Sequence, residues 1–278
     1  MIERDKQREW RWPNHIVMSP TSLNTFSQCH YRIKLQYLQN IKAPEKWVRA
    51  FAMGTAAHAA LGTIAQQMKV GTTPIGEEQI RTLALMRLPL GEYPSEMARD
   101  ADVNLVVRWV KLGQRWLESL DIQEFLLIEN GERRPVKLFP SQAEYKLVSR
   151  PDLIVRRSNG DGEFIHIIDW KTGQRYPNED VPVIMRYVTR DKLQEWTGDA
   201  SAANVLFTWN WLDLNEIDDF DASVETCNRV WPSIVDQMEA MASETEWKAT
   251  PGWHCKYCPY YQNYCSEEIP TTQGDYYE

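Results

Sequence analysis

The sequence predicts an α/β protein in which a central mixed sheet is flanked by helices. Three observations lead to this prediction. Residues 19–120 space their apolar side chains as helices do, and short β-rich runs separated by turn residues begin near residue 124. Beyond these runs, helical and strand patterns alternate towards the C-terminus, which is typical of helices packed against a sheet.

The N-terminal part contains the first predicted helices. One helix begins at the start signal Ser19-Pro20-Thr21-Ser22, and another covers about residues 48–68. Gly71-Thr72-Thr73-Pro74 then breaks the chain, and residues 76–120 have the pattern of two further helices. Because this block carries no evident chemical motif, we interpret residues 71–122 as a helical insertion.

The strands of the predicted sheet come next. A glycine-containing segment at 158–162 favours a hairpin connection between two of them. The β-rich runs are residues 125–128, 143–148, 152–155 and 164–168, and they are followed by a helix near 189–203, a strand at 204–209 and a helix at about 222–246.

Composition excludes several classes of protein. The 278 residues include 12 Trp, 12 Tyr and 7 Phe, which supply too much apolar surface for a disordered chain. No run approaches the ~18 apolar residues that a bilayer span needs, and residues 1–12 lack the apolar segment of a secretory signal. We therefore expect no membrane partner and a cytoplasmic location.

The predicted domain organisation is simple. We expect a loose N-terminal arm at 1–18, a single domain at 19–265 and a flexible acidic tail at 266–278. The formal net charge is −8, but ten acids lie in the tail and in the segment 213–225, where no base occurs. Without them the charge would be +2, which leaves room for a basic groove.

Two carboxylates and a lysine form the main candidate site. Arg150-Pro151-Asp152 lies on one predicted strand, and Asp169-Trp170-Lys171 ends the next. Alternate residues of a strand share a face, so Asp169 and Lys171 lie together, and the hairpin brings Asp152 beside them. Two converging carboxylates repel each other unless a cation lies between them, and oxygen ligands favour Mg²⁺ or Mn²⁺.

A lysine at such a site has a chemical use. Its ammonium can orient or deprotonate an attacking water and balance the charge that develops on a phosphate. These three side chains are therefore suited to phosphodiester hydrolysis. The alternative interpretation is a surface salt bridge among ordinary residues at strand ends.

The order of these motifs resembles the PD-(D/E)XK nuclease superfamily. Pro151-Asp152 followed by Asp169-x-Lys171 is similar to its core signature, and Gly54-Thr55-Ala56-Ala57-His58 resembles the histidine-bearing helix of its RecB-like branch. The resemblance implies a restriction-endonuclease-like core with Lys171 as a catalytic residue. It also implies a site for Mg²⁺ or Mn²⁺ whose ligands are His58, Asp152, Asp169 and the backbone carbonyl of Trp170.

A further segment resembles the same branch. Leu193-Gln194-Glu195-Trp196 is similar to its glutamine-containing helix, which implies that Gln194 reaches the site and contacts DNA or the water. The family pattern usually has a tyrosine a few residues later, whereas this chain has Gly198 and Asp199 there.

The cysteines form a second candidate metal site. Cys255-x2-Cys258-x6-Cys265 is a metal-binding pattern, and Cys29 is the candidate fourth ligand. Three local thiolates with one distant partner suit a 4Fe–4S cluster better than a zinc ribbon, which normally offers two Cys-x2-Cys pairs. Zinc held by the same sulfurs, or with His254 in place of one, is the alternative. Either metal would close the segment 247–265 onto Cys29.

The resemblance extends from Cys29 to Cys265 and includes the CRISPR-adaptation exonucleases and AddB-type subunits, which carry iron–sulfur clusters. It implies a DNA exonuclease acting on single strands or ends in repair, recombination, phage DNA processing or CRISPR adaptation. A helicase, a CRISPR-adaptation protein or a recombination protein is the implied partner. The alternative is a non-catalytic iron–sulfur DNA-binding or scaffolding subunit, and RNA remains open as a substrate.

Overall fold

The main sheet has five strands and is mixed, as the sequence predicts. The computed structural model describes residues 17–43, 45–129, 132–138, 143–160, 162–173, 175–201 and 203–265. Strands β5 and β6 run parallel, and the other neighbours are antiparallel. The order across the sheet is β1 (Ile122–Ile128), β4 (Leu153–Asn159), β5 (Gly162–Lys171), β6 (Val205–Trp211) and β7 (Glu216–Asp221).

The chain divides into two compact units. The second unit contains the main sheet and spans Val48–Glu132 and Ser149–Val230. The first unit takes the described parts of Met1–Trp47, Arg133–Val148 and Trp231–Glu278.

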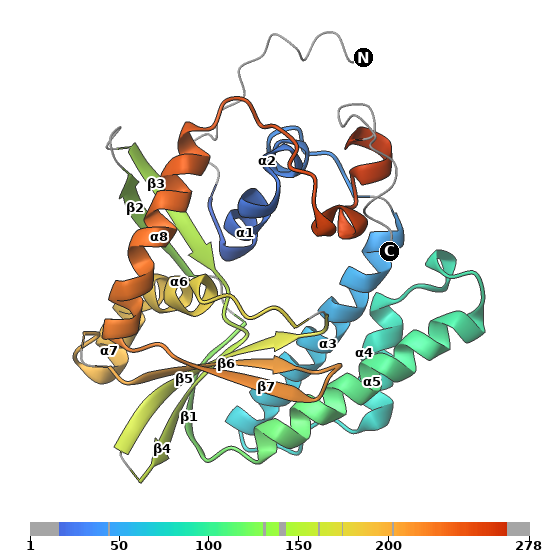
Figure 1. Ribbon diagram of the computed structural model, residues 1–278. Helices are drawn as coiled ribbons and strands as arrows, with labels where there is room; N and C mark the ends of the chain where they lie inside the picture. Colours follow the sequence, from blue (N-terminus) through green and yellow to red (C-terminus); the bar gives the residue numbers. More distant parts are fainter. Residues whose placement is uncertain are drawn as a thin grey trace. The chain divides into compact units, whose positions relative to one another are not determined.

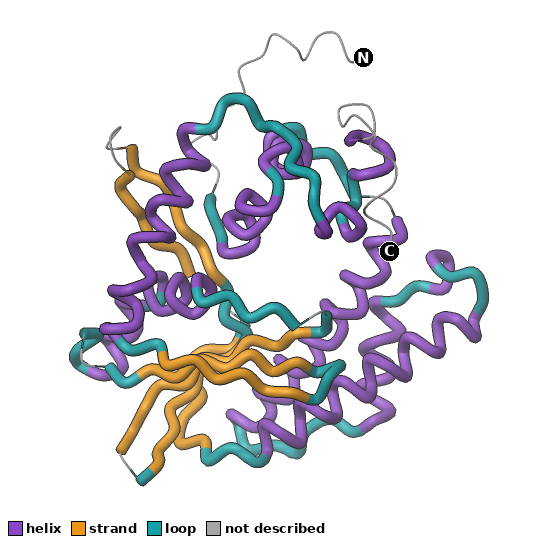
Figure 2. Tube along the Cα trace, in the orientation of Figure 1, coloured by secondary structure: helices purple, strands orange, loops and turns teal. Residues whose placement is uncertain are grey.

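Helices cover both faces of the sheet in the second unit (Figure 1). One face packs against α3, α4 and α5, and the other packs against α6 and α7. Figure 2 distinguishes the orange strands from the purple helices around them. The helices are α3 (Glu45–Lys69), α4 (Glu77–Arg87), α5 (Glu96–Glu118), α6 (Asp180–Val188) and α7 (Arg190–Thr197), with a short 3₁₀ helix, η2 (Leu90–Glu92), before α5.

The β4–β5 hairpin follows from its sequence. Leu153 and Val155 contribute to the core on the α3 side of the sheet, whereas Ile154 contributes to the core on the α7 side. A strand buried on both faces needs apolar residues at consecutive positions, which the run Phe164–Ile168 supplies. The predicted hairpin is confirmed, because Asn159 pairs with Gly162.

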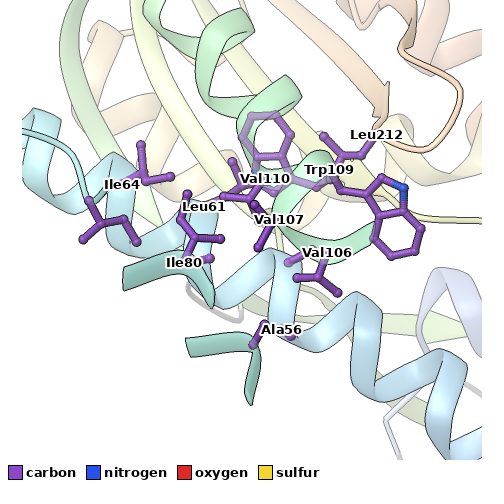
Figure 3. Packing of buried hydrophobic residues seen from close by; sticks show 14 of the residues in the cluster. Ala56, Leu61, Ile64, Ile80, Val106, Val107, Trp109, Val110 and Leu212 are labelled. Atoms are coloured by element: carbon purple, nitrogen blue, oxygen red, sulfur yellow. The ribbon is translucent and has the colours of Figure 1, made fainter. Parts of the chain in front are cut away.

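The helical layer of the second unit packs tightly. Apolar side chains of α3, α4 and α5 meet in one cluster (Figure 3). Gly113 of α5 lets the helices approach closely, because a Cβ there would lie only 2.9 Å from Leu61 of α3. The cluster therefore holds the long helix α3 firmly against the sheet. Labelled members are Ala56, Leu61, Ile64, Ile80, Val106, Val107, Trp109, Val110 and Leu212.

The first unit contains the remaining elements. Ser19 caps the N-terminus of α1 and begins it where the sequence predicts, by accepting a hydrogen bond from the Ser22 amide at 3.1 Å. The unit holds α1 (Pro20–Gln28), α2 (His30–Ile33), the π-helix η1 (Lys34–Leu38), the hairpin of β2 (Glu132–Leu138) and β3 (Ala143–Ser149), the end of α8 (Val224–Ser243), the 3₁₀ helix η3 (Trp253–Tyr257) and the π-helix η4 (Tyr261–Cys265).

Several strand and helix expectations need correction. The run at 143–148 forms β3, which pairs with β2 in a separate hairpin and not with the main sheet. The acidic segment after residue 213 contains the edge strand β7, which the sequence analysis did not predict. The helix expected at 189–203 is the shorter α7, and a further helix, α6, precedes it.

The predicted arm and tail lie almost wholly outside the described residues, which begin at residue 17 and end at residue 265. Within that described part, no helix has the length and apolar character to cross a membrane.

Candidate active site

The β4–β5 hairpin brings the two predicted carboxylates together. Leu153 pairs with Ile168, so the same register places Asp152 opposite Asp169. Both side chains are buried, with 7% and 4% of their surface exposed. The amide of Trp170 donates a hydrogen bond of 2.7 Å to Asp152 Oδ2, which fixes this carboxylate against the end of β5.

Helix α3 supplies the histidine. His58 Nδ1 lies 3.0 Å from Asp152 Oδ1, and the ring is partly exposed. Small residues around His58 allow α3 to approach the strand ends closely, since a Cβ on Gly54 would lie 3.0 Å from Thr172 Oγ1. The two motifs that lie almost a hundred residues apart in the chain therefore meet in space.

Lysine 171 completes the group. Its Nζ lies 2.6 Å from Asp169 Oδ2 in an ion pair. The angles of this contact are not those of a hydrogen bond, and no other described residue donates a hydrogen bond to this buried oxygen. Burial and the Asp152 charge raise the pKa of Asp169 to about 6, against the opposing effect of Lys171. A buried carboxylate oxygen is also the type of ligand that a hard divalent cation prefers.

The pKa values of the other groups reflect the same crowding. Burial acts to raise the pKa of Asp152, but the hydrogen bonds from His58 and the Trp170 amide outweigh it and lower the value. Burial acts to lower the pKa of His58, and the hydrogen bond to Asp152 raises it above its ordinary value. The contact between His58 and Asp152 therefore favours the charged form of both groups.

A cavity of about 590 Å³ opens at this point. Its lining includes His58, Asp152 and Lys171. Asp169 is not part of the lining, but it forms an ion pair with Lys171, which is. Two arginines, Arg87 and Arg150, also line the cavity and add positive charge to that of Lys171. Neither arginine was predicted as a site residue from the sequence. The other lining residues are Ala50, Phe51, Gly54, Thr55, Ala59, Glu129, Trp170, Thr172 and Gly173.

Glu129 is an acid that the sequence analysis missed. It follows β1, and its amide donates a hydrogen bond of 2.8 Å to the carbonyl of Asp152. Its backbone has φ 45°, a left-handed conformation that is uncommon for a residue other than glycine. Burial and the Asp152 charge raise its pKa. The only sequence signal was an acid directly after a β-rich run, which is common at strand ends.

The structure does not bring Gln194 to this group. Its side chain bonds within the C-terminal turn of α7, where its amide contacts the Gly198 carbonyl and its Oε1 accepts from the Ala200 amide at 3.0 Å. Gln194 is exposed and does not line the cavity. The left-handed Gly198 ends α7 and draws the glutamine side chain into this cap.

The cysteines of the second candidate site lie in the first unit as free thiols. Cys29 and Cys265 are buried in one apolar cluster, and Cys258 packs against it. Burial raises the pKa of Cys258, and the nearby Cys29 and Cys255 act in the same direction. Cys227 belongs to the second unit, with its Sγ 3.7 Å from the Ala222 carbonyl, and burial raises its pKa to about 11.

Neither candidate site encloses a preformed metal position. Within the ranges that the structure describes, no group of three or more His, Cys, Asp or Glu side chains is arranged to hold a metal ion. At the strand ends, His58 and Lys171 instead contact the two carboxylates directly. These contacts neutralise charges that a bound cation would otherwise balance.

Comparison with known proteins identifies the family. The model of the PD-(D/E)XK nuclease superfamily matches residues 17–266, and the chain therefore belongs to this superfamily. Membership implies a nuclease, that is, a hydrolase, and members in general use Mg²⁺ or Mn²⁺. The α/β fold with its mixed sheet is consistent with the restriction-endonuclease-like core that the sequence predicts.

Other comparisons add little. No curated protein matches the chain. One similar solved structure, described as "Crystal structure of SSO0001", has a TM-score of 0.38 and 14% identity, over 96% of this chain and 91% of that one.

Proposed function

We propose that this protein is a metal-dependent DNA nuclease whose active site is the cavity at the ends of β4 and β5. The observation that carries the proposal is the meeting of His58, Asp152, Asp169 and Lys171 through direct contacts, although they come from three separate segments. A salt bridge between ordinary strand-end residues would not need a buried carboxylate oxygen or a histidine from α3.

Each residue has a role in the proposed reaction. Asp152, Asp169, His58 and the Trp170 carbonyl would hold Mg²⁺ or Mn²⁺, which supplies a polarised phosphate and an acidified water when bound. Lys171, held beside Asp169, orients the attacking water and balances the negative charge that grows on the phosphate. The Trp170 amide keeps Asp152 in place during the reaction.

The substrate proposal is DNA, as a single strand or at an end, cleaved by an exonuclease in repair, recombination, phage DNA processing or CRISPR adaptation. Arg87 and Arg150 support a phosphate-bearing substrate, because they place positive charge in the cavity beside the carboxylates. A helicase, a CRISPR-adaptation protein or a recombination protein is the proposed partner.

The test is cleavage of end-labelled DNA with Mg²⁺ or Mn²⁺. Asp152→Asn, Asp169→Asn and Lys171→Gln should each lower the rate by at least about 10²-fold, because each removes a group that acts on the phosphate or the water. Asp236→Asn, which changes an exposed acid on α8, is the matched control and should keep full activity.

The substrate series separates the alternatives. An exonuclease should degrade linear single strands and leave circular ones intact, whereas cleavage of circles would indicate an endonuclease. RNA of the same sequence tests whether cleavage requires deoxyribose. Binding of DNA without any metal-dependent cleavage would contradict the proposal and favour the non-catalytic subunit.

We also propose that Cys29, Cys255, Cys258 and Cys265 bind a 4Fe–4S cluster. The residues fit such a group in their chemistry: all four are free thiols, three of them (Cys29, Cys258 and Cys265) lie in or against one apolar cluster of the first unit, and Cys255 is close enough to act on the pKa of Cys258. Arg32 supports the proposal, because its positive charge lowers the pKa of Cys258 while its own buried Nε has no hydrogen-bond partner among the described residues. An anionic thiolate cluster would satisfy that donor.

A further inference from the structure

A second hollow in the second unit lies between α4 and α5. It has a volume of about 390 Å³ and is separate from the catalytic cavity, with which it shares no lining residue. Val107 forms part of its wall, and the remaining lining side chains are polar or charged. These are Glu77, Arg81, Asn104, Arg108, Lys111 and Arg115, and we call them with Val107 the α4–α5 groove.

The groove has an excess of positive charge. Lys111 pairs with Glu77 at 2.6 Å, and Arg81 donates to Asn104. Arg108 and Arg115 are exposed, and neither has an ion-pair partner within 4 Å among the described residues. Glu77 is the single acid among four bases in the lining, although the whole chain has a net charge of −8.

The arrangement of the bases costs stability. Arg108, Lys111 and Arg115 are three and four residues apart on α5, so they lie on one helix face and repel one another. Because such like-charge pairs disfavour the helix, an anionic ligand that neutralises them offers a physical reason for the pattern.

The groove also has a rigid base. Val107 belongs to the core cluster that joins α3, α4 and α5, so the wall of the groove is fixed to the helix that carries His58 (Figure 3). Helix α4 carries Arg81 in the groove and Arg87 in the catalytic cavity. One strand of substrate can therefore meet basic side chains from a single helix at both places.

The spacing of the bases suits a nucleic-acid backbone. Arg108 and Arg115 are separated by about 10 Å along the helix axis, a length that spans more than one phosphate of a nucleic-acid strand. From these observations we propose that the α4–α5 groove binds the phosphate backbone of the DNA substrate at a distance from the cleaved bond. This inference rests on the proposed nuclease function and adds a second contact site to it.

The experiment uses the full chain with Arg108→Gln and Arg115→Gln combined. Binding to fluorescent single-stranded DNA is measured in EDTA over a series of salt concentrations. The dissociation constant should rise roughly 10-fold, and the slope of log K against log[salt] should fall in magnitude by about 1.4, since two phosphate contacts to a single strand are lost. The matched control combines Lys69→Gln and Arg190→Gln, which are exposed bases outside both cavities.

Cleavage adds a test by length. The double variant should lose activity on strands of about 40 nucleotides at limiting substrate but keep it on strands of about 8 nucleotides, which are too short to fill both sites.

Binding equal to that of the control double variant would overturn the groove proposal, even if cleavage by the wild-type protein is intact. The expected binding change in a protein that does not cleave would support the groove and contradict only the nuclease proposal. Equal loss of cleavage activity on both strand lengths would also overturn the groove proposal. An unfolding temperature of the double variant equal to that of the wild type excludes misfolding as the cause of any loss.

Discussion

At the scale of single residues, His166 shows how a titratable group is kept neutral inside the sheet. The side chain is 1% exposed. The Arg157 guanidinium can only donate, so Nδ1 of His166 accepts its hydrogen bond at 3.1 Å. Nε2 then donates to Thr208 Oγ1 at 2.6 Å, and Thr208 donates to Asp219 at 2.5 Å. Every polar atom of the imidazole is satisfied in the neutral form.

This network predicts a loss of stability in acid. Burial and the Arg157 charge lower the pKa of His166 to about 3. The unfolded chain therefore takes up a proton first as the pH falls below about 6.5, and the free energy of unfolding drops by up to about 1.4 kcal/mol per pH unit. Urea unfolding of the wild type and His166→Gln at pH 7.5 and pH 5 checks this.

The comparison isolates one group. Because the glutamine variant lacks the titrating ring, the stability advantage of the wild type should shrink by about 2 kcal/mol between the two pH values. An advantage that stays constant would mean that His166 is not held neutral in the folded protein.

The residues of the candidate site divide by how local their sequence signals are. His58, Asp152, Asp169 and Lys171 could be predicted because each lies in a short motif with a recognisable neighbour. Glu129 and Arg87 could not, because a single acid or base after a strand or helix carries no pattern. The position of Gln194 differs from the prediction for another reason. Its motif is present, but the helix ends at Gly198, and the glutamine side chain bonds to the Gly198 carbonyl.

At the scale of elements, the contact of α3 with α5 depends on a glycine. A Cβ at Gly113 would lie 2.9 Å from Leu61 Cδ2 and 3.0 Å from Leu212 Cδ2, and both leucines are fully buried. At Gly62 of α3, a Cβ would meet only the carboxylate of the exposed Glu129, at 3.0 Å. The two glycines lie within facing helices but have different freedom to accept a methyl group.

These surroundings predict opposite effects of alanine. Gly113→Ala should lower the free energy of unfolding by about 1 kcal/mol, since overpacking outweighs the roughly 1 kcal/mol gain in helix propensity. Gly62→Ala should raise it by up to about 1 kcal/mol, because the Glu129 side chain can move aside. Chemical denaturation of both variants measures the two values, and stabilisation by both would show that the helices can separate without cost.

The elements that the sequence did not predict share a physical cause. Strand β7 is an edge strand in which four of the six residues are acids, so it lacks the alternating apolar pattern that identifies a strand. Helix α6 has consecutive apolar and β-branched residues, because it is buried on most sides. Such a segment resembles a buried strand in composition. By contrast, β4 and β5 are short β-rich runs bounded by turn residues, and α3 and α5 lie in the segment whose apolar residues have helical spacing, so these elements were predicted.

At the scale of the whole molecule, contacts within the first unit join segments that lie more than two hundred residues apart in the chain. The Tyr31 amide donates to the Lys248 carbonyl at 3.1 Å, and the Tyr260 hydroxyl donates to the Ile41 carbonyl at 2.9 Å. His30 stacks on Phe26 and pairs with Glu244. The segment that carries the three C-terminal cysteines is therefore held against the helices that flank Cys29 by hydrogen bonds and an ion pair.

The proposed cluster predicts a large additional effect on stability. Cys29 is separated from the other three cysteines by more than two hundred residues. Closing a loop of this length restricts the unfolded chain, which by the entropic estimate amounts to about 5 kcal/mol. Replacing any one of Cys29, Cys255, Cys258 or Cys265 with alanine should lower iron content, solubility and the unfolding temperature together.

Cys227→Ala is the matched control for this prediction, because it removes a cysteine of the second unit and should leave the bound metal unchanged. Metal analysis and visible absorption of anaerobically purified protein measure the outcome. Colourless protein that contains zinc would favour the zinc alternative at the same four sulfurs. Full iron content in all four alanine variants would exclude both, since the metal would then be bound elsewhere.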